Sequence, residues 1–144
     1  MLINKHNSKS FSQIGLGIIQ SENYSFKARG LDIAAKNNIL VPRTYLLTHE
    51  LLHEFESSTF DKSRLTRQIQ ELPIKNSFSI RSAFSIEDQK ENSFAGMFET
   101  VISVSNKNPK HIIDAIKKVL ISAEKVKGDF RKDILIMEMV QAQF

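Results

Sequence analysis

The sequence of 144 residues contains no cysteine and no tryptophan. Without cysteine the chain can form no disulfide framework, thiolate nucleophile or thiolate metal site, which fits a reducing compartment such as the cytoplasm. It also has no run of about 18 apolar residues, so we expect neither a transmembrane helix nor a membrane partner. The opening residues, MLINKHNSKSFSQ, lack the apolar core of a secretory signal. We therefore expect a cytoplasmic protein.

The charge balance is mildly basic, with a formal net charge of +4 at pH 7. Lysines are scattered along the chain rather than gathered with aromatic residues into one basic block, so we expect no nucleic-acid partner. A mild positive charge suits a polyphosphate ligand equally well. Because 41% of the residues are hydrophobic, the chain can bury a core, either as one domain or as a piece of a larger one.

Apolar periodicity and capping residues predict short strands interspersed with amphipathic helices. Strand-like runs occupy residues 14–19, 39–47, 78–80, 101–104 and 134–140. Helical patterns occupy residues 31–36, 49–55, 57–72 and 109–126. Thr48 is a good N-cap for the helix at 49–55, and Pro109 suits the first helical position of the last one.

The polar stretch between the strand-like runs 78–80 and 101–104 has the chemistry of an anion-binding loop. Arg81, expected at the end of the first run, offers a planar fork of donors that suits phosphate oxygens. Gly96 lets the backbone come close to a ligand. Three hydroxyl groups, from Ser82, Ser85 and Ser93, add neutral donors and acceptors. These residue types are compatible with phosphate binding but do not specify it.

The order of residues in this loop is more specific than their chemistry. It resembles the arginine-serine-serine, acidic-acidic, serine-phenylalanine-alanine-glycine signature of the nucleotide-binding domain shared by phosphoenolpyruvate synthase, pyruvate phosphate dikinase and rifampicin phosphotransferase. These are ATP-grasp enzymes that use phosphohistidine. The matching residues form one ordered block: Arg81, Ser82, Glu87, Asp88, Ser93, Phe94, Ala95, Gly96 and Thr100. Ala83 departs from the pattern, because the family usually has a second serine there.

The resemblance covers about residues 27–140 and implies a single partial domain over 1–144. It implies an α+β fold with a mainly antiparallel sheet and covering helices, the first part of an ATP-grasp nucleotide-binding domain. The residues that it implies for nucleotide binding are Lys27, Arg81, Gly96, Thr100, Met137, Glu138, Met139 and Val140. Among them, Lys27 and Arg81 would neutralise phosphate charge during transfer and so act in catalysis, Gly96 and Thr100 would cradle the phosphates, and 138–140 would seat adenine and ribose.

Two segments depart from the family around these residues. Lys27 stands where the family has a glycine-glycine-lysine-glycine segment, and Ser25, Phe26 and Ala28 replace the three glycines. Met137 stands where the family usually has glutamine. Without the resemblance, Lys27 would be read as a solvated lysine ahead of a helix, and Met137 as a core residue.

The function implied by the resemblance is ATP-driven phosphorylation of a histidine on a separate domain. ATP would be the ligand, and Mg²⁺ would bind only with carboxylates from a part that follows these residues in the family. The partners would be the remaining domains of the parent enzyme or a separate subunit. We therefore expect the 144-residue chain to be inactive alone. The alternative is a catalytically inactive remnant or interaction module of the same fold, and the final phosphate acceptor stays open.

A more distant alternative is a zinc metalloprotease, because His49, Glu50 and His53 fit the pattern in which two histidines one turn apart hold zinc and a glutamate activates water. Two observations count against it. Glu54 places a charge directly after the second histidine, and no histidine between His53 and His111 can supply a nearby third ligand. Residues 41–55 also run in step with the family pattern, which predicts both histidines at surface positions and no metal site.

Overall fold

The computed structural model describes residues 11–75, 77–88 and 97–140. The strands are β1 (Phe11–Gln13), β2 (Thr44–Leu47), β3 (Phe78–Phe84), β4 (Thr100–Val104) and β5 (Lys132–Glu138). The helices are α1 (Phe26–Lys36), α2 (His49–Phe55), α3 (Lys62–Gln70) and α4 (Pro109–Ser122), with short 3-10 turns η1 (Ser85–Asp88) and η2 (Ala123–Lys125). The strands form one sheet in the order β1-β2-β5-β3-β4, and every neighbouring pair is antiparallel. The predicted α+β class is confirmed.

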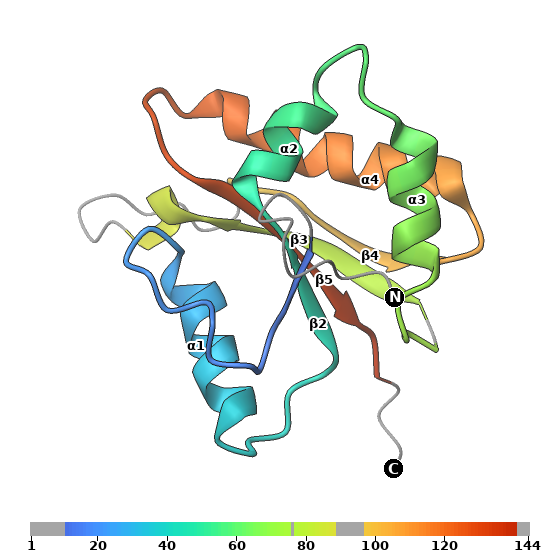
Figure 1. Cartoon of the computed structure of the whole chain (residues 1–144). Coiled ribbons are helices and arrows are strands. Elements are labelled where there is room, and N and C mark those ends of the chain that lie inside the picture. The colour runs from blue at the N-terminus through green and yellow to red at the C-terminus, as the bar shows by residue number, and fades with distance from the viewer. Residues whose placement is uncertain (1–10, 76, 89–96, 141–144) are drawn as a thin grey trace.

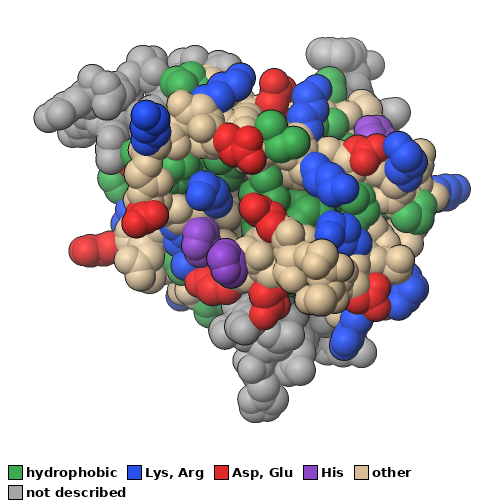
Figure 2. All heavy atoms as spheres, turned by 90° about the horizontal axis from the view of Figure 1, so that it is seen from above, with side chains coloured by type: hydrophobic (Ala, Val, Ile, Leu, Met, Phe, Trp, Pro, Cys, Tyr) green, Lys and Arg blue, Asp and Glu red, His purple; other side chains and the backbone are tan. Residues whose placement is uncertain are grey.

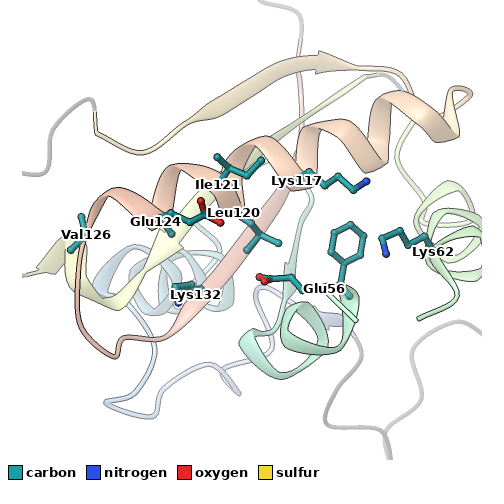
Figure 3. Close-up of a pocket in the computed structure, with 10 residues that line it drawn as sticks. Glu56, Lys62, Lys117, Leu120, Ile121, Glu124, Val126 and Lys132 are labelled. Carbon is teal, nitrogen blue, oxygen red and sulfur yellow. The ribbon is translucent and has the colours of Figure 1, made fainter. Parts of the chain in front are cut away.

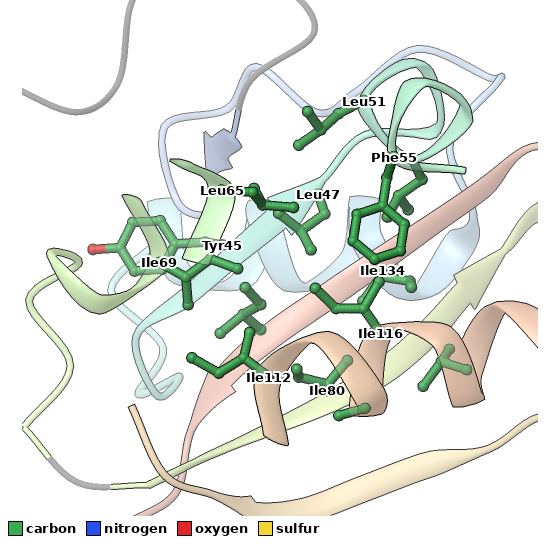
Figure 4. Close-up of a cluster of buried hydrophobic side chains, with 14 of the residues drawn as sticks. Tyr45, Leu47, Leu51, Phe55, Leu65, Ile69, Ile80, Ile112, Ile116 and Ile134 are labelled. Carbon is green, nitrogen blue, oxygen red and sulfur yellow. The ribbon is translucent and has the colours of Figure 1, made fainter. Parts of the chain in front are cut away.

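Helices α2, α3 and α4 lie on one side of the sheet (Figure 1), and the main hydrophobic core fills the space between them and the strands (Figure 4). On α4, Ile112, Ile116 and Val119 are fully buried, because their spacing of three and four residues puts them on one face of the helix. They belong to the same cluster as Ile80 and Ile136, which are paired between β3 and β5. Burying each such side chain stabilises the fold by about 1.5–3 kcal/mol.

Helix α1 lies alone on the other side of the sheet among the described helices (Figure 1). The smaller core on this side consists of Ile14, Ile19, Ala28, Leu46, Ala83 and Leu135. Residues directly opposite each other on neighbouring strands share a face of the sheet. Arg81 is paired with Leu135 and with Thr100. Arg81 and Thr100, two of the predicted site residues, therefore lie on the face that α1 covers at one end.

The predicted strand at 14–19 is wrong, because this segment is a turn built around one buried carboxylate. Asp32 of α1 is fully buried. It accepts hydrogen bonds from the backbone N–H groups of Gly15 (2.7 Å), Gly17 (3.1 Å) and Ile19 (3.0 Å) and from Nε2 of Gln20 (2.8 Å). The φ angles of Gly15 and Gly17 are 112° and 76°, which residues with a side chain rarely adopt. Burial raises the pKa of Asp32, but these donors outweigh it and lower the pKa below its ordinary value.

Other boundaries differ by a few residues from the predicted ones. Helix α2 and its N-cap are confirmed, since the Thr48 side chain accepts a hydrogen bond from the N–H of Leu51. Helix α1 starts earlier than predicted, at Phe26, while α3 is shorter than the predicted 57–72. Strand β3 continues past residue 80 to Phe84. In the described part of the chain, no helix is long and apolar enough to cross a bilayer.

Candidate functional site

Arg81 lies in the middle of β3 rather than at the end of a strand, which corrects the predicted position. It stands between Leu135 of β5 and Thr100 of β4. The Nε atom of its guanidinium group is buried and has no hydrogen-bond partner within the described residues. A buried polar donor without a partner costs about 1–3 kcal/mol, and more when the group is charged. An anion bound on this face would remove that cost.

Lys27, on the first turn of α1, reaches β3 and η1 rather than solvent. Its Nζ donates to the carbonyl oxygen of Ser82 at 2.9 Å and to Oε1 of Glu87 at 3.0 Å. The second oxygen of Glu87 accepts the backbone N–H of Phe84 at 2.7 Å. Both side chains of the ion pair are mostly shielded, with 33% of Lys27 and 20% of Glu87 exposed. Two of the three ammonium donors are therefore used within the chain, and the charge is already balanced.

Asp88, the second residue of the acidic pair, binds the beginning of α1. Its two carboxylate oxygens lie 3.2 and 3.0 Å from the backbone nitrogen of Phe26, whose N–H they accept. Burial raises the pKa of Asp88 above its ordinary value, even though the Phe26 N–H acts in the opposite direction. A carboxylate at this place also interacts favourably with the positive end of the helix dipole. Glu87 and Asp88 of η1 thus both bind residues in the first turn of α1.

Thr100 and Met137 share the sheet face of Arg81. Thr100 lies opposite Arg81 on the edge strand β4 and is exposed. Met137 is half-buried and lies between Thr44 of β2 and Ser79 of β3. Residues two apart on a strand point to the same face, so Ser79 and its partner Met137 lie on the side of Arg81. Gly96 is outside the described residues, as is the whole segment 89–96.

The predicted adenine segment at the end of β5 is already engaged in the fold. The backbone N–H of Glu138 donates to Arg43 O at 2.8 Å, and that of Met139 donates to Ser77 O at 2.9 Å. The Glu138 carboxylate accepts the N–H of Lys75 at 3.0 Å. Val140 is 67% exposed. Within the described residues its N–H has no hydrogen-bond partner, so it is the backbone donor of this segment that a ligand can still use.

His49, but not His53, belongs to a partly buried polar cluster that sequence reasoning missed. His49 is half-buried, not at the surface as predicted, and its Nδ1 accepts the backbone N–H of Lys132 at 2.9 Å. Both Glu50 oxygens bind Arg131, at 2.7 and 2.9 Å. His53 is exposed, as predicted. Among the described residues no group of three or more His, Cys, Asp or Glu side chains is placed to hold a metal ion.

Asp133 is the centre of this cluster. It is fully buried and accepts the backbone N–H of His49 at 2.7 Å and Nε of Arg131 at 2.9 Å. Burial raises the pKa of Asp133 to about 6, against the lowering effect of Arg131. Burial also acts to raise the pKa of Glu50, but the hydrogen bonds from Arg131 outweigh this effect, and the pKa lies below its ordinary value. Burial and then Arg131 lower the pKa of His49. The charged residues directly before the apolar run 134–140, among them Arg131 and Asp133, were the sequence feature that could have indicated this cluster.

The contacts of this cluster engage Glu50 and His49, two of the three residues of the zinc-protease pattern. A zinc protease needs a glutamate that is free to accept a proton from water. Here both oxygens of Glu50 are bound to Arg131, and one ring nitrogen of His49 is bound to the backbone. The ring accepts at Nδ1, so the neutral imidazole carries its proton on Nε2. These contacts give the HELLH segment a structural role, joining α2 to the start of β5.

Comparison with models of known protein families finds a match. A family model described as the pyruvate phosphate dikinase AMP/ATP-binding domain matches residues 60–127. The matched span includes Arg81, Gly96 and Thr100 but neither Lys27 nor residues 137–140. No curated protein and no solved structure matches the chain. Over residues 60–127 the chain is therefore similar to the AMP/ATP-binding domain of pyruvate phosphate dikinase.

Proposed function

We propose that this chain is the ATP-binding portion of a dikinase-like phosphotransferase, which serves the phosphorylation of a histidine on a separate domain or subunit. The nucleotide would lie along β3, on the face of the sheet that α1 covers at one end. The matched family span supports nucleotide binding and includes β3 and β4. The geometry of the described residues supports the placement.

The observation that carries this proposal is the state of Arg81. Arg81 is half-buried, lies in the middle of β3 and has a buried Nε without a partner in the described residues. Arginine presents planar pairs of donors that suit phosphate oxygens. A charge held in this way, without a carboxylate within the described residues, is an arrangement suited to an anionic ligand.

The order of residues along the sheet fits an elongated ligand. Met137 lies opposite Ser79, two residues before Arg81 on β3, and Lys27 binds the carbonyl group of Ser82, one residue after it. The segment proposed for adenine thus lies toward one end of β3. The two cations proposed for the phosphates lie in the middle and toward the other end. An ATP molecule would extend from the end of β5 toward the beginning of α1.

A second candidate function is a non-catalytic interaction module of the same fold. The Lys27–Glu87 ion pair favours it, because it neutralises one of the two cations proposed for the phosphates. The backbone N–H groups of Glu138 and Met139 are also occupied by Arg43 and Ser77. Both features would be expected after loss of nucleotide binding, when the vacated groups find partners within the chain.

A titration with ATP followed by amide chemical shifts distinguishes these two candidates. An open half-site leaves much of the ligand in water, so we expect a Kd on the order of 1 mM, or about 4 kcal/mol. Shifts should concentrate at Arg81, Gly96 and Thr100. Arg81→Ala should weaken binding by about 1.5–3 kcal/mol, the range for a hydrogen bond to a charged group. Arg64→Ala is the matched control, since Arg64 is exposed on α3.

The outcomes separate the candidates because each predicts a different spectrum. ATP binding that is lost in Arg81→Ala and kept in Arg64→Ala supports the nucleotide site. If 5–10 mM ATP moves none of the three amides while the spectrum stays folded, the nucleotide proposal is wrong and the interaction module stands. Equal weakening in both variants would indicate non-specific attraction of the polyphosphate to positive charge.

A further inference from the structure

A hollow of about 460 Å³ lies between the ends of α2 and α4, on the side of the sheet that these helices cover (Figure 3). Its lining residues are Phe55, Glu56, Lys62, Lys117, Leu120, Ile121, Ala123, Glu124, Val126 and Lys132. The volume is within the range of roughly 300–1,000 Å³ that is typical of small-molecule sites. Because α2 and α4 pack on the side of the sheet opposite to α1, this hollow is separate from the face that carries Arg81.

The floor of the hollow is apolar and well ordered by the core. Phe55 and Ala123 are each 1% exposed and Leu120 is 7% exposed. All three belong to the main hydrophobic cluster, so the floor cannot shift without disturbing the core. Ile121 is 58% exposed at the rim. An apolar group of a ligand would therefore be buried mainly against Ile121, next to the closed floor of Leu120 and Ala123.

Three lysines stand around this floor. Lys62 and Lys132 are half-buried, and Lys62 lies 5.0 Å from the centre of the Phe55 ring. Neither they nor Lys117 form an ion pair with a carboxylate within the described residues. Lys62 and Lys117 extend toward one another from α3 and α4 (Figure 3). On this face, basic and acidic side chains stand around apolar ones (Figure 2). Lys117 is exposed, so an anion between Lys62 and Lys117 would be reached from solvent and would meet positive charge that no carboxylate of the described residues binds directly.

The balance of charge limits the kind of anion. Three lysines and two glutamates, Glu56 and Glu124, line the hollow, which leaves a net charge of +1. A singly charged head group suits this balance better than a doubly charged phosphate. We propose that the hollow binds a small amphipathic carboxylate, with its head between Lys62 and Lys117 and its apolar chain over Leu120 and Ile121.

Hexanoate is a suitable probe, and two close relatives of it test the two halves of the proposal. Acetate has the same head without the chain, and hexylammonium has the chain with the opposite charge. In a titration followed by amide shifts, hexanoate should perturb Leu120, Ala123 and Val126 in a saturable way and leave Arg81 unchanged. Acetate and hexylammonium should bind at least tenfold more weakly. Each added methylene should tighten binding about threefold until the hollow is filled.

Substitutions of the two converging lysines test the head-group site. The double variant Lys62→Gln, Lys117→Gln should weaken hexanoate at least fivefold. Lys118→Gln is the matched control, because Lys118 is exposed on α4 and does not line the hollow. Unchanged amide shifts elsewhere will show that each variant is folded. The proposal is overturned if hexanoate causes no saturable shifts, if hexylammonium binds equally well, or if the double variant and Lys118→Gln behave alike.

Discussion

The buried carboxylate of Asp133 gives a prediction about stability and pH whose sign and size both follow from the structure. Burial raises the pKa of Asp133 from an ordinary 3.8 to about 6. Between these two values the folded chain binds a proton that the unfolded chain does not. The contribution of Asp133 to stability is therefore fully present below about pH 3.8 and is lost as the pH rises through 6. The full loss is about 3 kcal/mol, at about 1.36 kcal/mol for each unit of pKa difference.

Only part of this change falls in a convenient pH range. Between pH 5 and pH 7 the linkage relation gives a loss of about 1.3 kcal/mol in the free energy of unfolding. The measurement is urea denaturation at pH 5, 6, 7 and 8 for the wild type and for Asp133→Asn. Subtracting the two curves isolates the titration of Asp133 from groups common to both proteins. The difference should favour the wild type by about 1.3 kcal/mol more at pH 5 than at pH 7.

His49 is the main complication, because its lowered pKa gives a slope of opposite sign. The stability that neutral His49 contributes to the fold is lost as the pH falls below 6.5, the ordinary pKa of histidine. Repeating the comparison in a His49→Gln background removes that titration while keeping an acceptor for the Lys132 N–H. Asp114→Asn is the control, since Asp114 is exposed and its lowered pKa places its titration below this range. A flat difference curve in both backgrounds, or one that rises with pH, would refute the reasoning.

Two further predictions concern carboxylates that hold α1 in place. Asp32→Asn should destabilise the fold by about 2–3 kcal/mol, because an amide NH₂ group then faces backbone donors that the carboxylate accepted. Thermal unfolding checks this against Asp129→Asn, an exposed control, and equal melting temperatures would contradict it. Glu87→Gln should tighten ATP binding by up to about fivefold, because it keeps an acceptor for Lys27 but removes the opposing charge of a partly exposed pair. Unchanged or weaker binding in the ATP titration would show that the ion pair does not limit access to Lys27.

Local signals predicted the elements whose ends are fixed by their own residues. Thr48 caps α2, and Pro109 is the first residue of α4, so both helix starts could be read from the sequence. The apolar run of β5 is likewise buried on both faces of the sheet, as its composition indicates. These are short-range effects, and they do not depend on which elements become neighbours.

The missed features depend on partners that are distant in the sequence. The run 14–19 has the composition of a strand, but Asp32, more than ten residues away, bends it into a turn. Arg81 was expected at a strand end because polar residues follow it, whereas pairing with β4 and β5 continues the strand to Phe84. Of the candidate site, the sheet brings Arg81, Thr100 and Met137 onto one face. It also shows what the sequence could not, that Lys27 already has a partner.

The hydrogen bonds of Asp32 link the turn at 14–19 to α1, so we expect these two segments to unfold together. Among the described strands, β1 pairs only with β2, and three backbone N–H groups of the turn after it donate to the Asp32 carboxylate of α1. When α1 melts, the amides of Gly15, Gly17 and Ile19 lose their acceptor at the same moment. Their hydrogen exchange should therefore report the opening of α1 rather than their own surface position. Lys27 would be released from Ser82 and Glu87 in that same event. The exchange rates of the Gly15, Gly17 and Ile19 amides would therefore measure how often the Lys27 side chain leaves the sheet.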